Sequence, residues 1–439
     1  MRRLLCVAYH FPPIGYSGVQ RTVKFIRYLE DFGWRTTVVA GPQASEEGLL
    51  PLDRTLADEI PADTTVLRVT RPEPSPSTGN RARAERWLRM PRPWSRWWVD
   101  EVAAVGAQAA RDADVLFCSM SPFESATATA RLAARSGRPW VADLRDPWAL
   151  DEMLVFPTWL HRRAELRVMR RALSSASAIV MNTPDAARAL ASEFPEMDGR
   201  VHAITNGFDA TDFAGPPPVR DDGLFRIVHT GSFHTDAGMQ RRTMRVRRLT
   251  GGTIGGVDFL TRSHVFLVQA VSRLVEREPG LASRIRLVFA GISSPADQAH
   301  TAPFVEFVPY LPHGESVALM RSADMLFLPM HDVHPGRRVR IVPGKTYEYL
   351  AAGPPILAAV PQGDARTLIR EAGAGYVCDP SDVECIARTI REAVRRADAG
   401  EAPPHADPEI IARYERRELT RRLALVLEGA LGTGGRPST

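Results

Sequence analysis

Short apolar segments alternate with amphipathic helical segments along nearly the whole of this 439-residue chain, and few folds accommodate such a pattern. The first apolar segment, "RLLCVAYHF", precedes a helix whose apolar positions begin at Val19 and end before Gly33, where the next apolar segment, "TTVVAG", follows. Strands that are apolar on both faces lie inside parallel sheets that helices cover on both sides. The alternation therefore predicts an α/β fold with doubly wound parallel sheets.

A linker rich in proline and aspartate divides this pattern into two halves. The segment "NGFDATDFAGPPPVRDDG", residues 206–223, has no periodicity, and the apolar segment "FRIVHTGSF" begins soon after it. A chain of this length also exceeds what one hydrophobic core usually organises. We expect an N-terminal Rossmann-like domain at 1–212, a C-terminal Rossmann-like domain at 223–407 and a last helical stretch at 408–431, with a ligand cleft between the two domains.

Composition argues against several classes of protein. The hydrophobic fraction of 44% and the charged fraction of 24% are typical of globular proteins, and no apolar run has the length of a transmembrane helix. A net charge of +5 is small for this length, so we do not expect nucleic-acid binding. The N-terminal apolar run breaks at Pro12 and lacks a cleavage site, which favours a buried strand over a signal peptide. These features predict a cytoplasmic protein.

The four cysteines show no spacing typical of a metal site. Cys6, Cys118, Cys378 and Cys385 are scattered, and three of them lie in or beside predicted buried strands. Buried free cysteines behave as small apolar side chains. We therefore expect reduced thiols and no disulfide bond.

The segment "VPGKTYEYLAAGPPILA", residues 342–358, predicts a short helix between a loop and a buried strand. Gly353 suits a left-handed cap, and the two prolines that follow cannot continue the helix. Lys345 and Glu348 are three residues apart and therefore share a face of this helix. They form either an exposed ion pair or two contacts to one bound ligand.

Six stretches together resemble the retaining glycosyltransferases of the GT-B fold, particularly the family-4-like group. They are "YHFPPIGYSGVQRTVKFIRYLEDFGW", "PWVADLRDPW", "NGFD", "HTGSF", "SADMLFLPM" and "KTYEYLAAGPPILA", and they follow the family's order along nearly the whole chain. The resemblance implies two Rossmann-like domains that face a central cleft. It also implies a nucleotide-sugar donor held mainly by the C-terminal domain, a hydroxyl acceptor held mainly by the N-terminal domain, and a last helix that crosses back to the first domain.

The resemblance implies a donor site at the "HTG" turn and at the start of the 342–358 helix. Glu348 takes the position of the glutamate that binds the ribose hydroxyls, which suits a carboxylate. Lys345 is the candidate for neutralising the diphosphate, together with backbone N–H groups at the two turns. The full set of expected donor-binding residues is Gly18, Gly231, Ser232, Leu311, Arg340, Gly344, Lys345, Thr346 and Glu348.

Some positions depart from the family pattern. Arg340 stands where the family often has a second glutamate that contacts the transferred sugar. Ser232 and Ala237 stand where it often has an arginine and a lysine that neutralise the diphosphate. Another cation must therefore supply that charge, and Lys345 is the first candidate, with Arg340 behind it.

A glycine- and arginine-rich segment at 238–262 lies between the "HTGSF" stretch and the next predicted helix. Such a long loop in a compact domain is either mobile and functional or disordered. Arg241 and Arg242, in the cluster "RRTMRVRRL", are further candidates for binding the diphosphate. The alternative for both is ordinary surface charge.

A charged trio at the end of the predicted strand "PWVADL" gives the expected catalytic residues of the first domain, Asp143, Arg145 and Asp146. Many relatives have a histidine where Arg145 stands. A carboxylate at this place could orient or deprotonate an acceptor hydroxyl, and an arginine could bind an anionic group. The alternative is an Asp–Arg pair that fixes the loop. Gly18 would let its loop approach the donor, or it marks a simple turn before the helix.

Two further clusters have alternative explanations. His331, Asp332 and His334 follow a predicted strand of the second domain, but no further ligand is spaced with them, so contacts with sugar hydroxyls or ordinary loop polarity fit better than a metal site. The segment "RWLRMPRPWSRWW", Arg86–Trp98, mixes aromatic residues with arginines. It makes either a peripheral membrane contact or a set of tryptophans packed between helices.

The expected reaction is sugar transfer to a hydroxyl with retention of the anomeric configuration, in glycan or glycosylated natural-product biosynthesis. The residues provide electrostatic contacts and no nucleophile with a paired base, so the protein would position the reactants and stabilise the leaving diphosphate. No cofactor or metal ion is expected. Two alternatives stay open. One is a pseudo-glycosyltransferase that only binds nucleotides or has altered chemistry, and the other is a nucleotide-sugar epimerase of the same fold.

Overall fold

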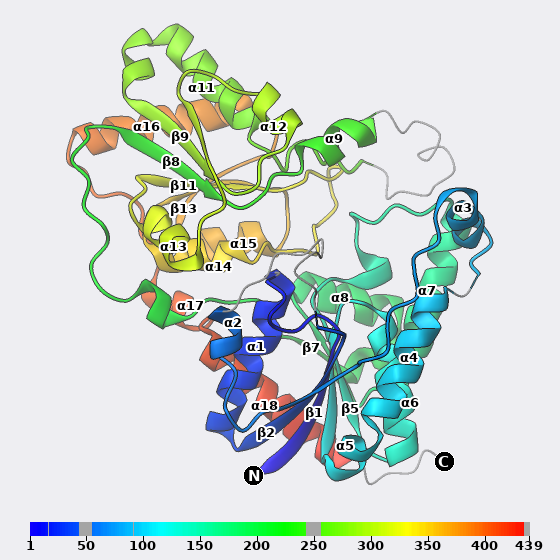
Figure 1. Ribbon diagram of the computed structural model, residues 1–439. Coiled ribbons are helices and arrows are strands. Elements are labelled where there is room, and N and C mark those ends of the chain that lie inside the picture. Colours follow the sequence, from blue (N-terminus) through cyan, green and yellow to red (C-terminus); the bar gives the residue numbers. More distant parts are fainter. Residues whose placement is uncertain (16, 44–54, 91, 243–255, 434–439) are drawn as a thin grey trace. The chain divides into compact units, whose positions relative to one another are not determined.

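The structure is a computed structural model that describes the chain except for residues 16, 44–54, 91, 243–255 and 434–439. The described chain forms two compact units, Met1–Asn206 with Arg416–Thr439, and Gly207–Glu415. Each unit contains one parallel sheet with helices around it (Figure 1). This confirms the predicted α/β fold with two Rossmann-like domains. The middle of the segment 238–262, the side chain of Arg242 and the end of the C-terminal tail lie outside the described residues.

The first unit contains a seven-stranded sheet in the order β3-β2-β1-β4-β5-β6-β7, and all its pairings are parallel. Its strands are β1 (Arg2–Ala8), β2 (Trp34–Ala40), β3 (Thr65–Arg68), β4 (Val115–Met120), β5 (Trp140–Leu144), β6 (Ala178–Met181) and β7 (Val201–Ala203). Its helices are α1 (Ser17–Leu29), α2 (Thr55–Asp58), α3 (Gly79–Trp87), α4 (Pro93–Val105), α5 (Ala107–Asp112), α6 (Glu124–Ser136), α7 (Trp159–Leu173), α8 (Pro184–Glu193) and α18 (Arg416–Thr433).

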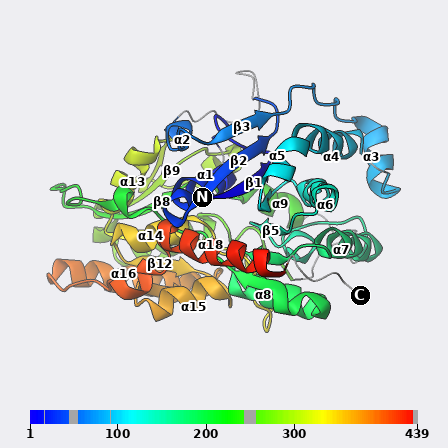
Figure 2. The ribbon, with the colours of Figure 1, turned by 90° about the horizontal axis from the view of Figure 1, so that it is seen from below.

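Two apolar clusters fill the first unit, one on each face of its sheet, because alternate residues of a strand point to opposite faces. In β1, Leu5 belongs to the cluster that contains helices α4 and α6, whereas Leu4 and Cys6 belong to the cluster with α1. The C-terminal helix α18 packs against α1 and against strands β4 to β6, and Figure 2 shows it beside α1. Its Leu419, with other apolar residues of the helix, is buried in the same cluster as α1.

The second unit contains a six-stranded parallel sheet in the order β10-β9-β8-β11-β12-β13. Its strands are β8 (Phe225–Thr230), β9 (Ile285–Ala290), β10 (Val305–Val308), β11 (Met325–Pro329), β12 (Ile356–Ala359) and β13 (Gly375–Cys378). Its helices are α9 (Thr235–Arg242), α11 (Val265–Arg277), α12 (Pro295–Ala299), α13 (His313–Arg321), α14 (Lys345–Ala352), α15 (Asp364–Glu371), α16 (Val383–Asp398) and α17 (Pro408–Ala412). No described helix of the chain is long and apolar enough to cross a bilayer.

Helix α14 is held firmly between the sheet and α17. Tyr347 and Tyr349 are almost completely buried, and the ring of Tyr347 packs 5.2 Å from the ring of Tyr414, just after α17. The helix ends at Gly353, whose φ of 102° is open to glycine and costly for other residues. Its first residue, Lys345, is therefore fixed at the amino end of a rigid element.

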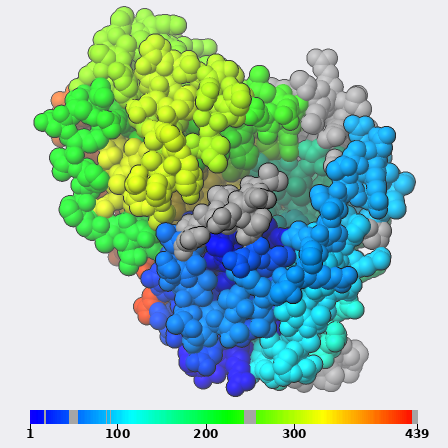
Figure 3. Space-filling model, in the orientation of Figure 1, coloured from blue at the N-terminus to red at the C-terminus, as the bar shows by residue number. Residues whose placement is uncertain are grey.

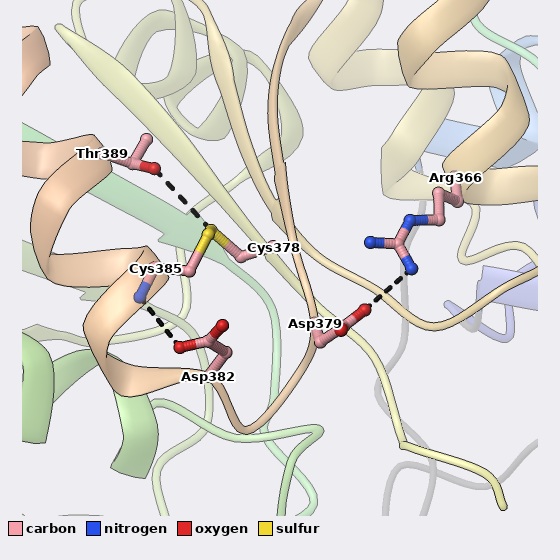
Figure 4. The surroundings of a disulfide bond; sticks show 6 residues. All are labelled: Arg366, Cys378, Asp379, Asp382, Cys385 and Thr389. Atoms are coloured by element: carbon pink, nitrogen blue, oxygen red, sulfur yellow. Dashed lines mark hydrogen bonds and ion pairs between the residues drawn. A yellow bond between two sulfur atoms is a disulfide. The ribbon is translucent and has the colours of Figure 1, made fainter. Parts of the chain in front are cut away.

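The expectation that all four cysteines are free is wrong for one pair. Cys378 and Cys385 form a disulfide bond, with their Cα atoms 5.9 Å apart (Figure 4). Cys378 ends β13 and Cys385 lies in the first turn of α16, where the Asp382 carboxylate accepts a hydrogen bond from the Cys385 N–H at 2.9 Å. The tight turn between the strand and the helix brings the two side chains together, and the spacing in sequence does not show this. Cys6 and Cys118 are buried free thiols.

Candidate functional site

The carboxyl ends of β8 and β9 meet at two glycines. Gly231 follows β8 with a φ of 107°, and Gly291 follows β9 with a φ of 148°. A Cβ atom on Gly291 would lie 2.9 Å from the carbonyl carbon of Gly231, so the two turns are too close for a side chain at Gly291. Gly231 itself is exposed. The turn after β8 therefore presents bare backbone to a ligand.

Lys345, the first residue of α14, reaches across to this turn. Its Nζ atom donates hydrogen bonds to the carbonyl oxygen of Thr230, at 2.6 Å, and to Nε2 of His229, at 3.0 Å. A Cβ atom on Gly231 would lie 2.6 Å from the same Nζ atom. The end of the strand and the start of the helix are 115 residues apart in sequence. The fold thus places one ammonium group directly on a glycine turn.

Buried neighbours hold Lys345 in this position. His229 donates from Nδ1 to the carbonyl oxygen of Phe327 at 2.9 Å, so its Nε2 atom is the acceptor for Lys345. Burial, helped by the nearby Lys345 charge, holds the pKa of His229 well below its usual value, and the imidazole stays neutral. The hydroxyl of Tyr349 accepts a hydrogen bond from the Thr230 N–H at 3.0 Å. The end of β8 is thereby fixed to α14 through both Lys345 and Tyr349.

Burial also lowers the pKa of Lys345 to about 7, with a further contribution from the Arg262 charge, whereas the Glu348 carboxylate acts in the opposite direction. A lysine with this pKa loses a large part of its charge near neutral pH. An anion bound at the turn would favour the charged form and raise the pKa again. Protonation of Lys345 and binding of an anion at this turn would therefore be coupled.

Glu348 lies on the same face of α14 as Lys345 and is half-buried. Within the described residues it forms no hydrogen bond or ion pair, so the exposed Lys345–Glu348 ion pair considered above does not form. Thr346 is buried, and its hydroxyl oxygen has no hydrogen-bond partner among the described residues. Gly344, before the helix, is exposed and caps it with no side-chain hydrogen bond. The amino end of α14 therefore offers a carboxylate with lone pairs available for a ligand, whereas the N–H groups of Thr346 and Tyr347 already donate to the carbonyl oxygens of Pro343 and Gly344.

The other expected donor-binding residues are spread over separate segments. Ser232, next to Gly231, is exposed. Leu311 is half-buried in the loop after β10, and Arg340 is half-buried in the loop before α14. Gly18 belongs to the first unit. Of these four residues, only Ser232 lies at the Gly231 turn that Lys345 contacts, because it is the next residue in the chain.

Arg241, the described member of the arginine pair, faces an aromatic ring. Its guanidinium carbon lies 3.4 Å from the centre of the Phe259 ring, a cation–π contact in the second unit. Burial lowers the pKa of the neighbouring His234 to about 4, and the charges of Arg262, Lys345, His331 and Arg241 act in the same direction. The Arg241 charge therefore acts on the same region of the unit as Lys345.

Two of the residues that build this site, His229 and Tyr349, were not predicted. His229 reads as a polar residue inside an apolar strand, and Tyr349 as part of the apolar face of a helix. Both are almost completely buried. A polar residue in the "IVHTG" strand was the one available signal, because a buried imidazole needs a hydrogen-bond partner.

In the first unit, Asp143 forms a buried ion pair with Arg21. The Asp143 side chain is fully buried at the end of β5, and it accepts hydrogen bonds from Nη2 of Arg21 at 2.7 Å and from Nε at 3.0 Å. Arg21 also donates to the carbonyl oxygens of Ile204 and Thr205. An Asp–Arg pair thus fixes the end of the sheet, but its arginine is Arg21 and not Arg145. This contact gives Asp143 a structural role.

Arg145 lies against the start of α1. A Cβ atom on Gly18 would lie 1.0 Å from Nη1 of Arg145, so the guanidinium occupies the space that any side chain at Gly18 would need. Arg145 is 7% exposed, and its Nε atom donates to the carbonyl oxygen of Met120 at 2.9 Å. Burial and the Arg145 charge lower the pKa of His10 to about 4. Asp146, the next residue, is half-buried. Gly18 and Arg145 therefore lie against each other, and Asp146 adjoins Arg145 in sequence.

The histidines and aspartate after β11 are divided between core and surface. His331 is fully buried, and its ring stacks 6.0 Å from the ring of Phe259. The backbone of Asp332 pairs with Asp258, and burial raises the pKa of the Asp332 carboxyl group. His334 is exposed. Among the described residues there is no group of three or more histidine, cysteine or acidic side chains arranged to hold a metal ion.

Comparisons with known families cover both halves of the chain. Residues 17–207 match the Glycosyl transferase 4-like domain, and residues 259–402 match Glycosyl transferases group 1. The matches include strands of both sheets, whereas β1 and β8 precede the matched residues. A search of curated protein sequences finds no matching relative.

Solved structures with the same fold are similar over nearly their whole length. HepE from Anabaena in complex with UDP has a TM-score of 0.61 and 15% identity, covering 98% of this chain and 100% of that chain. Sucrose-phosphate synthase from Thermosynechococcus elongatus has a TM-score of 0.59 and 13% identity, covering 99% and 98%. A putative UDP-N-acetylglucosamine 2-epimerase from Listeria monocytogenes has a TM-score of 0.56 and 12% identity, covering 99% and 98%. These similarities show the fold.

Proposed function

The chain belongs to the GT4-like, group 1 glycosyltransferases of the GT-B fold, and from this premise we propose that it transfers a sugar from a nucleoside-diphosphate donor to a hydroxyl group with retention of configuration. Glycosyl transfer from a nucleotide sugar follows from the family. The retention, the roles of individual residues and the nucleotide are our proposals.

The contact between Lys345 and the Gly231 turn carries the proposal. A departing nucleoside diphosphate gains negative charge as the glycosidic bond to the sugar breaks, and a fixed cation stabilises that charge best when it needs no rearrangement. Nζ of Lys345 is held by Thr230 and His229 at 2.6 and 3.0 Å, beside exposed backbone. We place the diphosphate at this turn. There it would pair with the Lys345 ammonium group, favour its protonated form and so raise the pKa of the lysine.

We assign Glu348 to the ribose of the same donor. A carboxylate accepts hydrogen bonds from two adjacent hydroxyls, and Glu348 is half-buried with no partner among the described residues. Because Lys345 and Glu348 share one face of α14, a single nucleotide would contact both. This explains why the two residues are three apart without forming an ion pair.

For the acceptor side we propose Arg145 and Asp146, and we leave Asp143 out. Arg145 is positioned by Met120 and fits over Gly18, so it could hold an anionic or hydroxyl group of a ligand at the end of the first sheet. The proposed reaction proceeds on one face of the sugar. The leaving diphosphate accepts the acceptor proton while the acceptor oxygen forms its bond to the anomeric carbon. We do not expect this step to need a metal ion, because Lys345 supplies the positive charge.

We propose UDP as the first nucleotide to test, because the Anabaena structures with this fold contain UDP or UDP-glucose. An epimerase is the second candidate, supported by the similar fold of the putative epimerase from Listeria. The two reactions differ in their products. A transferase releases UDP only when a sugar leaves the donor, whereas an epimerase of this kind forms a new nucleotide sugar.

The proposal is tested with a panel of UDP-sugars, with and without hydroxyl acceptors, by measuring free UDP and new nucleotide sugars. We expect UDP release that rises with an acceptor, and a decrease in kcat of about a hundredfold or more in Lys345→Met. A variant with wild-type turnover would remove Lys345 from the mechanism. Formation of an epimerised nucleotide sugar without an acceptor would decide for the second candidate.

A further inference from the structure

Two segments expose an unusual number of large apolar side chains: α3 with the residues that follow it, and residues 154–173, which contain α7. Thirteen large hydrophobic residues of the described chain are exposed, and seven of them lie in these two segments. They are Trp87, Leu88, Met90, Leu154, Trp159, Leu160 and Val168. Trp87 and Trp159, at 58% and 54%, are the only exposed tryptophans among the described residues. Scattered apolar residues are normal on a protein surface, whereas a cluster of this kind marks an interaction site.

Direct contacts hold the two segments together. The ring of Trp87 lies 5.5 Å from the ring of His161, and Nε2 of His161 bonds to the carbonyl oxygen of Trp87 at 3.0 Å. Arg89, with a φ of 52°, turns the chain after α3 and donates to the carbonyl oxygen of His161 at 3.0 Å and to Glu165 at 3.1 Å. In Figure 1 α3 lies beside α7, and in Figure 3 the light-blue segment around α3 and α4 lies at the molecular surface. We call the seven apolar residues the aromatic patch.

The tryptophans of the segment 86–98 divide between this patch and the core. Trp97 and Trp98 are buried against α6, and Nε1 of Trp98 donates to the hydroxyl of Ser125 at 3.0 Å. For Trp97 and Trp98, the expectation of tryptophans packed between helices is therefore confirmed. Trp87 is exposed, and so is Trp159, which lies in a segment that the sequence did not single out. The patch is therefore additional to the packing of α4.

Arginines surround the patch and give it a positive charge. Five arginines of the two segments are exposed and form no ion pair within the described residues. They are Arg83, Arg92, Arg163, Arg167 and Arg171. The last three lie on the face of α7 that carries Leu160, because residues three or four apart share a face. The nearby carboxylates of Glu85 and Glu165 are already paired with Arg81 and Arg89.

We propose that the aromatic patch and its arginines dock on an anionic lipid bilayer. Tryptophan is preferred at the boundary between headgroups and acyl chains, and arginine can keep its charge among the phosphates while its aliphatic part contacts apolar surface. Each arginine near an anionic leaflet adds to the binding energy. A second copy of this chain fits less well as the partner. In a self-complementary contact the five arginines of one copy would face the same arginines of the other, and these like charges would repel. The proposal is independent of the donor site in the second unit.

The test is sedimentation of the full-length protein with vesicles of phosphatidylcholine alone and of phosphatidylcholine with phosphatidylglycerol. We expect binding to the anionic vesicles that weakens as salt is added. The variant Trp87→Ser with Trp159→Ser removes the aromatic contacts, and Arg163→Glu with Arg167→Glu reverses two charges. Each double variant should bind at least about tenfold more weakly.

Matched controls separate the patch from general surface effects. Val219→Ser with Leu425→Ser replaces exposed apolar residues elsewhere, at 95% and 55% exposure, and Arg370→Glu with Arg388→Glu reverses exposed charges in the second unit. These controls should bind vesicles like the wild type, and all variants should keep the wild-type melting temperature within a few degrees. The proposal is overturned if the wild type does not bind the anionic vesicles, or if the patch variants bind as well as the controls. It is equally overturned if light scattering shows a dimer that the patch variants dissociate.

Discussion

At the scale of single residues, the choice of lysine at position 345 is informative. The chain has 56 lysine and arginine residues, and only two of them, Lys24 and Lys345, are lysines. Arginine keeps its charge in every protein environment, whereas a buried lysine changes its pKa readily. At Lys345 burial brings the pKa to about 7. We infer that this position requires a compact cation that can be neutral without a ligand and charged with one.

The close approach of Gly231 to Lys345 allows a matched test of the turn. In Gly231→Ala the new methyl group would lie 2.6 Å from Nζ and displace the lysine, whereas in Gly353→Ala, at nearly the same φ, it would meet nothing within 4 Å. Both variants should lose about 1–2 kcal/mol of stability from the positive φ. Only Gly231→Ala should also lose affinity for UDP, by at least about tenfold, as measured by calorimetry. Equal affinities in the two variants would show that the contact with Lys345 does not matter for binding.

Individual site residues were predictable only in part. The shared face of Lys345 and Glu348 followed from helical spacing, and the structure keeps both on α14. The hydrogen bond from Lys345 to His229 did not follow, because it depends on how the amino end of α14 meets the end of β8. The same limit applies to Asp143. Its partner, Arg21, lies 122 residues away in α1, and nothing in the sequence pattern favours Arg21 over the adjacent Arg145.

At the scale of elements, the disulfide bond fixes the last strand of the second sheet to a helix. It closes a short loop between β13 and α16, beside an ion pair between Arg366 and Asp379 at 2.7 Å (Figure 4). For a sequence separation of 7, the loss of chain entropy in the unfolded state corresponds to roughly 2–3 kcal/mol.

We therefore expect reduction to lower the thermal stability of the second unit. The measurement is a melting curve of the wild type with and without dithiothreitol, compared with Cys385→Ser. The reduced wild type and the variant should melt at a similar, lower temperature, and the variant should not respond to the reductant. A wild-type curve that dithiothreitol leaves unchanged would show that the bond does not stabilise the fold.

The elements themselves were largely predictable, with instructive exceptions. The long apolar strands and the helices with a clear apolar face stand out in the sequence because the interior of a doubly wound sheet demands them. The strand β3 was missed because its four residues, Thr65–Arg68, lie at the edge of the sheet and are only partly buried. The helix α17, Pro408–Ala412, packs with α14 in the second unit, although the sequence pattern joins it to the terminal helix.

At the scale of the whole molecule, the C-terminal helix α18 belongs to the first unit. Its leucines complete an apolar cluster with α1, and Nη2 of Arg422 donates to the carbonyl oxygen of Ala203 at 2.9 Å. The last helix thus supplies part of the core of the first unit. The stability of the N-terminal half should therefore depend on residues more than two hundred positions later in the chain.

Two leucines of α18 test this dependence within one helix. Leu423 is fully buried and Leu425 is 55% exposed. Leu423→Ala should destabilise the first unit by about 2–5 kcal/mol, because it leaves a cavity, whereas Leu425→Ala should cost less than about 1 kcal/mol. Chemical unfolding followed by tryptophan fluorescence reports on this unit, since all eight tryptophans lie within it. Similar losses for both variants would argue against packing of α18 in this core.

The central claim, that Lys345 binds the diphosphate of a nucleotide-sugar donor, is tested most directly by a pH titration of protein with isotope-labelled lysine. The spectrum should contain the side-chain signals of Lys24 and Lys345 alone, and Lys24, paired with Glu59 in the first unit, serves as the reference. Without nucleotide we expect Lys345 to titrate with a pKa of about 7, and saturating UDP should raise this pKa while Lys24 stays unchanged. Because binding then requires the protonated lysine, the affinity for UDP should decrease as the pH rises above 7. A Lys345 signal that ignores UDP and every other nucleoside diphosphate would contradict the account.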